Sequence, residues 1–217
     1  VHSNLYIVLT SPAGRGKKST AMKLGRSLLK NVGNYGAEVH FSTQAASSAA
    51  LIQQFVKLGG KPHQSLTCHS LELGSLLGTK NDDMTIFLTD IFDCNPDWDK
   101  QTVSRGLELI EKPWLNLLAG TTPTWLGDNL SNTALEGGFI SRTIFVYADT
   151  RRLVAIPKMT DAQKKLRQSL SHDLAHIAGL KGTFRMTKEA EDAYVKWYEG
   201  PDRVKAEVDV KLATYYE

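Results

Sequence analysis

The chain has 217 residues, of which 41% are hydrophobic and 23% are charged, with a net charge of +3. These values are typical of a globular protein with a sizeable core, and they permit contact with nucleic acid without requiring it. No apolar run approaches the roughly 20 residues that span a membrane, and no signal peptide precedes the first expected strand. The 2 cysteines are too few for a disulfide framework. We therefore expect a cytoplasmic protein with no membrane association.

Short apolar runs alternate with helical patterns over the first two thirds of the chain. The expected strands are Leu5–Thr10, Glu38–Thr43, Ser65–Ser70, Leu115–Thr121 and Thr143–Tyr147. The expected helices are Ala21–Lys30, Ala45–Leu58, Leu71–Leu77, Met84–Phe92 and Thr102–Glu111. This alternation predicts an α/β fold in which a parallel sheet of five strands lies between helices. Ligands of such sheets bind beyond the carboxyl ends of the strands.

The strand signals stop after about Pro157. The pattern beyond this point predicts helices over Asp161–Leu180 and Thr187–Trp197, and a third that begins near Pro201. We therefore expect a core over residues 1–156 and a helical lid or C-terminal subdomain over residues 157–217.

The segment between the first strand and the first helix has the composition of a phosphate-binding loop. Glycines allow the backbone N–H groups to turn toward phosphate oxygens, and the helix start and a lysine add positive charge. The sequence thus predicts a site for ATP and Mg²⁺. The residues expected to bind the nucleotide are Ala13, Gly14, Arg15, Gly16, Lys17, Lys18, Ser19 and Thr20.

Two registers fit the pattern G-x-x-x-x-G-K-[ST] in part. The favoured register uses Gly16 and Lys17, so that Lys17 binds phosphate, while Lys18 stands where the Mg²⁺-binding hydroxyl belongs. Ser19 would then reach the metal from one residue further along. The other register pairs Lys18 with Ser19 and places Lys17 in the glycine position.

A hydrolytic site also needs an acid that supports the metal and orients water. Glu72 follows the third expected strand and is the favoured acid, although Leu71 occupies the preceding position where a second acid is usual. Asp90, at the end of the run Ile86-Phe-Leu-Thr-Asp90, is the alternative. A solvated surface carboxylate is the alternative interpretation of either residue.

Two further groups could contact the γ-phosphate. Thr121 or Thr122, at the end of the fourth expected strand, could hydrogen-bond the attacking water. Arg142 follows a glycine pair and precedes the fifth strand, and its planar guanidinium suits phosphoryl oxygens. It could act as an arginine finger in its own subunit or across a subunit interface.

The segments SPAGRGKKST, TCHSLEL, LNLLAGTTPTWL and GGFISRTIFVY, in this order, resemble the helicase-like P-loop ATPases of phages and prophages. These proteins are related to the AAA+ and superfamily III helicases and are often fused to primase modules. The resemblance covers residues 1 to about 150 and implies ATP hydrolysis and a ring of identical subunits, for example a hexamer. It also implies action on DNA, with a single strand as the expected form, in replication. It assigns phosphate binding to Lys17, the acid to Glu72, the sensor to Thr122 and the finger to Arg142.

Other functions remain open. Because Lys18 and Leu71 depart from the ATPase pattern, the chain could instead be a DNA-binding scaffold that binds nucleotide without hydrolysing it. His172 and His176 share a helix face as in a zinc motif, with Glu199 as a possible third ligand, but a solvent-facing helix is the simpler interpretation. The basic run Lys164–Arg167 fits a helix that faces DNA, and equally a solvated one.

Overall fold

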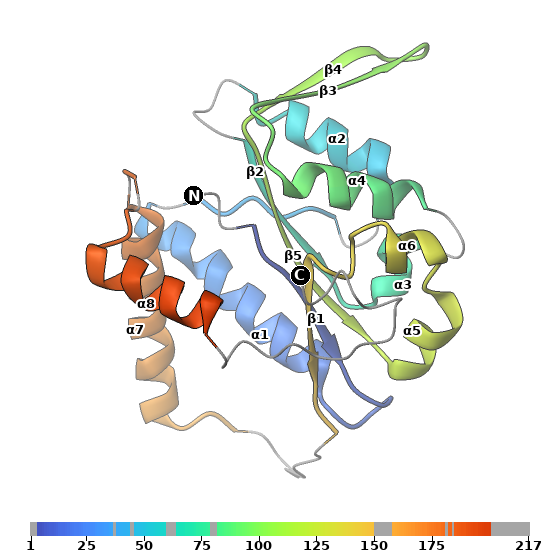
Figure 1. Cartoon of the computed structure of the whole chain (residues 1–217). Coiled ribbons are helices and arrows are strands. Elements are labelled where there is room, and N and C mark those ends of the chain that lie inside the picture. The colour runs from blue at the N-terminus through green and yellow to red at the C-terminus, as the bar shows by residue number, and fades with distance from the viewer. Residues whose placement is uncertain are drawn as a thin grey trace.

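The computed structural model describes residues 4–36, 38–43, 46–59, 64–78, 82–149, 158–180, 182–183 and 185–200 (Figure 1). Its strands are β1 (Tyr6–Thr10), β2 (Gln64–Ser70), β3 (Asp97–Thr102), β4 (Gly106–Glu111), β5 (Pro113–Thr121) and β6 (Thr143–Tyr147). Its helices are α1 (Lys18–Asn31), α2 (Ser48–Val56), α3 (Leu73–Leu77), α4 (Asp83–Phe92), α5 (Pro123–Asn129), α6 (Asn132–Glu136), α7 (Asp161–Ala178) and α8 (Lys188–Glu199). A 3-10 turn, η1 (Val32–Tyr35), follows α1.

The main sheet has four parallel strands in the order β2-β5-β1-β6. Strand β1 is central, and its Tyr6 lies opposite Leu117 of β5 and Thr143 of β6. Tyr6 and Val8 are fully buried, as expected for a strand that is covered on both faces. The predicted α/β fold with a parallel sheet between helices is therefore confirmed.

The expected strand Glu38–Thr43 forms one bridge at the outer edge of β2 rather than a strand. The N–H of Thr67 donates to the carbonyl of His40 at 2.8 Å, and the N–H of Ser42 donates to the carbonyl of Thr67 at 3.0 Å. Phe41 is half-buried. This segment lies at the sheet edge and pairs with β2 on one side only, and the pairing is limited to this bridge.

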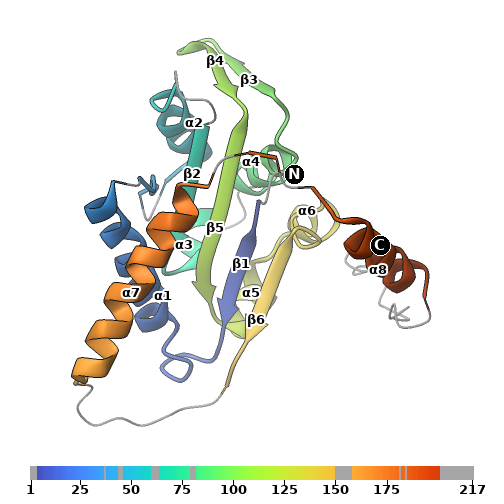
Figure 2. The ribbon, with the colours of Figure 1, turned by 90° about the vertical axis from the view of Figure 1, so that its left-hand side faces the viewer.

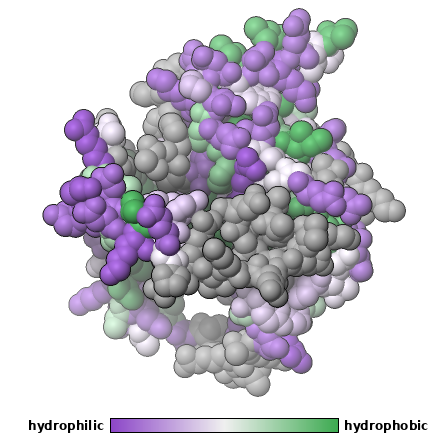
Figure 3. Space-filling model, viewed as in Figure 1, coloured by the Kyte–Doolittle hydropathy of each residue, from purple (hydrophilic) through white to green (hydrophobic). Residues whose placement is uncertain are grey.

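The expected helix Thr102–Glu111 is wrong, because this segment belongs to an antiparallel β3–β4 hairpin. Leu107 and Leu109 are exposed whereas Glu108 and Ile110 are buried, which is the two-residue period of a strand. The turn of the hairpin uses Gly106 at φ +70°. The hairpin projects from the body at the top of Figure 1, and apolar residues show in green at the corresponding edge of Figure 3.

Helices cover both faces of the sheet. Helix α1, with α7 outside it, lies on one face, and α3, α4, α5 and α6 lie on the other (Figures 1 and 2). The main core forms between the sheet and this second group together with α2, where Leu51, Phe55, Leu73, Leu88 and Ile91 are fully buried. Both faces of β1 are thus covered, and ligands of such sheets bind beyond the carboxyl ends of the strands.

The predicted helices of the C-terminal part are present as α7 and α8. Helix α7 packs on α1 and η1, and the Arg167 guanidinium donates to the Ser27 hydroxyl. The expected boundary after residue 156 and the expected helix after Pro201 lie outside the described residues. None of the described helices combines the length and apolar character that crossing a membrane requires.

Candidate phosphate-binding site

The loop between β1 and α1 folds around the side chain of Ser11, which is fully buried. The N–H of Gly16 donates to the Ser11 hydroxyl at 3.2 Å. A Cβ atom on Gly16 would lie 2.6 Å from the Ser11 Cβ, so this position accepts no side chain without displacing the loop. Gly14 has φ +71°, a conformation that glycine adopts without strain. Both glycines of the predicted loop are therefore used for backbone geometry.

The two adjacent lysines of the loop have different environments. Lys17 is exposed and has φ +46° at the position before α1. Lys18 is the first residue of α1, and its ammonium turns back into the loop, where it donates to the Ser11 carbonyl at 2.8 Å and the Ser11 hydroxyl at 2.9 Å. The positive charge inside the loop thus comes from Lys18. Lys17 adopts the left-handed conformation that glycine favours.

Helix α1 begins without a side-chain cap and with no acidic residue in its first turn. Helices α3 and α4 also lack a side-chain cap, whereas α2, α5, α7 and α8 are capped by Ser47, Thr122, Thr160 and Thr187. The first N–H groups of an uncapped helix carry partial positive charge and attract anions. Ser19, half-buried, and Thr20, exposed, lie in this first turn beside Lys18.

Thr122 lies beside the loop at the carboxyl edge of the sheet. Thr10 at the end of β1 pairs with Thr121 at the end of β5, and the N–H of Ser11 donates to the Thr121 carbonyl at 3.4 Å. The Thr122 hydroxyl caps α5 by accepting the N–H of Trp125 at 3.2 Å. Because it accepts in this bond, its own proton remains available to a ligand.

Glu72 lies at the same edge, one strand further from the loop. It follows β2 and stands at the start of α3 with an exposed side chain. Strand β5 separates β2 from β1, and the carbonyl of Leu71 packs against Gly120 of β5. Glu72 is therefore on the correct edge, with its carboxylate in solvent.

The alternative acid, Asp90, is on a helix rather than at the end of a strand. It belongs to α4, and its carboxylate accepts the indole N–H of Trp98 at 2.5 Å. Trp98 comes from the β3–β4 hairpin and packs edge-on against Phe87. Asp90 therefore holds the hairpin to α4, and this contact gives it a structural role.

Arg142 lies at the opposite edge of the sheet from the loop. It immediately precedes Thr143, which is level with Tyr6 at the amino end of β1. Its guanidinium donates to the Gly138 carbonyl at 3.2 Å and pairs with Asp93 at 3.2 Å. An arginine at the amino edge does not reach a loop at the carboxyl edge of the same sheet. Arg142 could therefore act as an arginine finger only for the loop of a neighbouring subunit.

The histidine pair is on one face of α7, as predicted. His172 contacts the ring of Tyr35 and lies 3.5 Å from the carboxylate of Asp173. Among the residues that the structure describes, no three His, Cys, Asp or Glu side chains are grouped so that they could hold a metal ion.

A buried hydroxyl and an ion pair at the site edge were missed from the sequence. The Thr10 hydroxyl is buried at the foot of the loop and has no hydrogen-bond partner among the described groups. Arg15 extends from the loop to Asp149 beyond β6, with 3.7 Å between Nη1 and Oδ1. The sequence signal for Thr10 was its place as the last residue of a buried strand.

His69 lies under the start of α1, and its burial makes the stability of the fold depend on pH. It is 2% exposed, and its Nε2 lies 3.2 Å from the carbonyl of Met22. Burial, opposed by the Met22 carbonyl and reinforced by Arg26, lowers the pKa of this imidazole. The native state therefore keeps His69 neutral, while the unfolded state gains a proton below its ordinary pKa of about 6.5.

We expect the free energy of unfolding to be highest above pH 6.5 and to fall as the pH drops below it. The share that His69 contributes to this fall is at most about 1.4 kcal/mol at pH 5.5, the value for an imidazole that stays neutral in the folded state. Denaturant unfolding of the wild type and of His69→Gln, at pH 7.5 and 5.5, measures it. The variant should lose less stability on acidification, and an equal loss in both proteins would contradict the assignment.

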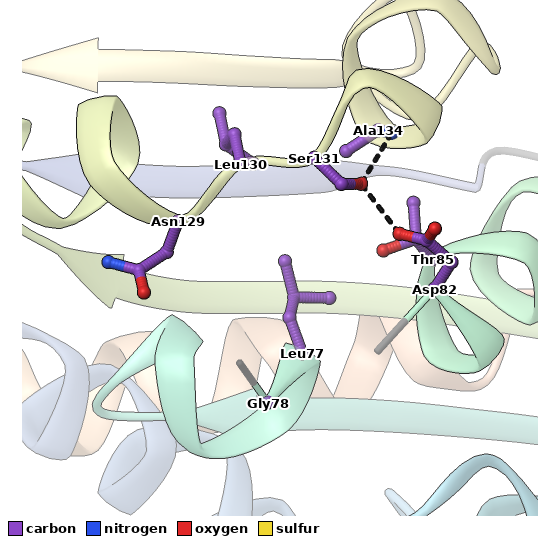
Figure 4. A pocket seen from close by; sticks show the side chains of 8 residues that line it. All are labelled: Leu77, Gly78, Asp82, Thr85, Asn129, Leu130, Ser131 and Ala134. Atoms are coloured by element: carbon purple, nitrogen blue, oxygen red, sulfur yellow. Dashed lines mark hydrogen bonds between the residues drawn. The ribbon is translucent and has the colours of Figure 1, made fainter. Parts of the chain in front are cut away.

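A pocket of about 10 Å³ lies between the α3–α4 and α5–α6 connections (Figure 4). The Ser131 hydroxyl donates to the Asp82 carboxylate at 2.6 Å and accepts the N–H of Ala134 at 3.0 Å. The space suits about one water molecule. The bond between Ser131 and Asp82 links the two connections. The pocket itself is too small for a nucleotide.

No protein-family model matches the chain, and no curated protein matches it significantly. The assignment of a function therefore depends on the geometry of the site.

Proposed function

We propose that the chain binds a nucleoside triphosphate, ATP, at the loop between β1 and α1. The observation that carries this proposal is the Lys18 ammonium, held 2.8 Å from the Ser11 carbonyl at the uncapped start of α1. A cation, free helix N–H groups and a glycine turn at the carboxyl edge of a parallel sheet together suit a phosphate chain. The single bridge at Phe41 supports a P-loop sheet whose fifth strand is reduced to one pairing.

Within this proposal, Lys18 rather than Lys17 binds the β- and γ-phosphates. This choice selects the register in which Ser19 follows the lysine and supplies the hydroxyl for Mg²⁺, with Glu72 as the nearby acid. Lys17 then fills the position of the second glycine, in agreement with its φ of +46°. A bound Mg²⁺ supplies charge neutralisation at the phosphate oxygens, and it takes few protein ligands because it retains water.

The residues at the edge support hydrolysis by attack of water on the γ-phosphate. Glu72 orients the water, Thr122 donates a hydrogen bond to it, and Lys18 with the loop N–H groups stabilises the charge that develops. By resemblance, this turnover drives a helicase-like movement on DNA in a ring, where Arg142 of a neighbouring subunit serves as the finger. The salt bridge of Arg142 with Asp93 is half-exposed, so its guanidinium can exchange partners.

Phosphate release with and without single-stranded DNA tests the hydrolytic part. We expect DNA to stimulate release and Glu72→Gln to reduce it by about 100-fold or more with little change in ATP affinity. Asp90→Asn is the matched control and should retain turnover. Tight ATP binding without release, unchanged by Glu72→Gln, would contradict the motor.

A second candidate function is a scaffold that binds nucleotide without turnover. The exposed carboxylate of Glu72 and the apolar Leu71 beside it favour this candidate, because together they offer one acid where a metal-dependent hydrolase commonly has two. In this case nucleotide should change the oligomeric state, as analytical ultracentrifugation can measure, with no release of phosphate.

A further inference from the structure

A basic, amide-rich groove runs along the contact of α7 with η1 and the end of α1. It has a volume of about 450 Å³, and its lining includes Asn31, Asn34, Tyr35, Lys164, Arg167 and Gln168. Among the described residues that line it, none carries a carboxylate. The volume lies within the range of ligand sites and accommodates roughly one or two nucleotide units.

The two helices that border the groove carry an excess of positive charge, although the Lys18 ammonium turns into the β1–α1 loop and the Arg26 guanidinium lies over the Phe41 ring. Helix α1 carries Lys18, Lys23, Arg26 and Lys30 and no acidic residue. Helix α7 adds the basic run Lys164–Arg167. Such a concentration of cations attracts a polyanion and raises the rate at which it associates.

The charged residues of the groove have separate functions. Arg167 donates to the Ser27 hydroxyl and so fixes α7 to α1. Lys164 pairs with Asp161 at 2.8 Å, but both side chains are mostly exposed, at 63% and 92%. An exposed pair of this kind contributes little to stability. The Lys164 ammonium can therefore exchange its carboxylate for a phosphate.

The uncharged side chains of the groove could contact unpaired bases by stacking and hydrogen bonding. Tyr35 is 48% exposed, and the edge-on contact with His172 holds its ring. The amides of Asn31, Asn34 and Gln168 offer both donors and acceptors. An aromatic face beside cations and amides is the usual arrangement for single strands, whose bases stack while the backbone follows the positive charge.

We propose that this groove binds a segment of single-stranded nucleic acid, with Tyr35 stacking on a base and Lys164 contacting a phosphate. This inference rests on the proposed function for the kind of partner, and it adds the place and the residues. Helix α1 connects the two sites, since it begins at Lys18 in the phosphate loop and ends at Asn31 in the groove.

Binding of a labelled 20-nucleotide oligo-dT, followed by fluorescence anisotropy without nucleotide, tests the groove. Leaving out ATP means that a failure of the phosphate loop does not affect the result. We expect Lys164→Ala to weaken binding by about 3- to 10-fold and to reduce the salt slope by about 0.7, the value for one phosphate contact on a single strand. Tyr35→Ser should weaken binding by roughly 5- to 150-fold, the range for one stacked base.

Lys165→Ala is the matched control, because it removes the same charge from the next residue of α7, outside the groove lining. It should change affinity by less than about twofold, the size of a screened long-range effect. Gln168→Glu, which adds a carboxylate to the groove without changing its shape, should weaken binding at least as much as Lys164→Ala. Oligo-rU should compete with oligo-dT, and thymidine monophosphate should not.

The proposal is overturned if oligo-dT does not bind at low salt, or if Lys164→Ala and Lys165→Ala weaken binding equally. It is also overturned if a duplex of the same length binds as tightly as the single strand, because stacked and paired bases are not available to Tyr35.

Discussion

Lys18→Ala is expected to lower ATP affinity by at least about 100-fold, whereas Lys17→Ala should lower it by less than about threefold. The lysine that enters the loop loses at least two hydrogen bonds to charged phosphate oxygens, each with a value of about 1.5–3 kcal/mol. Lys17 is exposed and has no described hydrogen bond from its ammonium to the loop. Titration of each variant with a fluorescent ATP analogue in the presence of Mg²⁺ measures the difference.

The comparison between the two lysines has an internal control. Both substitutions remove one positive charge from adjacent residues, so a general electrostatic effect would weaken binding equally. Denaturant unfolding shows whether loss of the Lys18 contacts to Ser11 also destabilises the loop. If Lys17→Ala abolished binding and Lys18→Ala did not, the register based on Gly16 and Lys17 would be correct instead.

Gly120→Ala is expected to destabilise the protein by about 2–3 kcal/mol, because it overpacks a junction between β5 and the end of β2. The added Cβ would lie 2.7 Å from the Leu71 carbonyl oxygen and 3.3 Å from the Met22 sulfur. The first of these atoms belongs to the backbone, so the clash moves the chain that carries Glu72. Turnover should therefore fall together with stability, which urea unfolding measures.

Gly25→Ala is the opposite case and serves as the control. Gly25 is in the interior of α1, and a Cβ there meets no atom within 4 Å. Alanine at an open helix position should stabilise the protein by up to about 1 kcal/mol. Equal destabilisation by the two substitutions would show that Gly120 has no special packing constraint.

The sequence predicted strands β1, β5 and β6 correctly because they are short apolar runs with turn signals on both sides. The prediction was wrong for the β3–β4 hairpin, where tertiary contacts determine the secondary structure. Leu107 and Ile110 have the spacing of a helix face, yet Leu109 is exposed and Ile110 is buried, as in a strand. Strand β3 contains one buried apolar residue, Trp98, so it has no hydrophobic run to detect.

The site could be predicted in part. The places of the β1–α1 loop, Thr122 and Glu72 follow from their positions at the ends of parallel strands, and the structure puts all three at one edge of the sheet. The choice between Lys17 and Lys18 depends on backbone dihedral angles that the residue pattern does not specify. The position of Arg142 was open to inference, since a residue directly before a parallel strand lies at the amino edge.

Hydrogen–deuterium exchange with and without ATP and Mg²⁺ tests most directly whether this loop is the nucleotide site. The account predicts slower exchange in the peptides that cover residues 13–20, where the loop and the first turn of α1 present their N–H groups. The groove residues of α7 should show a smaller change. Nucleotide binding without protection of residues 13–20, or no binding at millimolar ATP, would contradict the account.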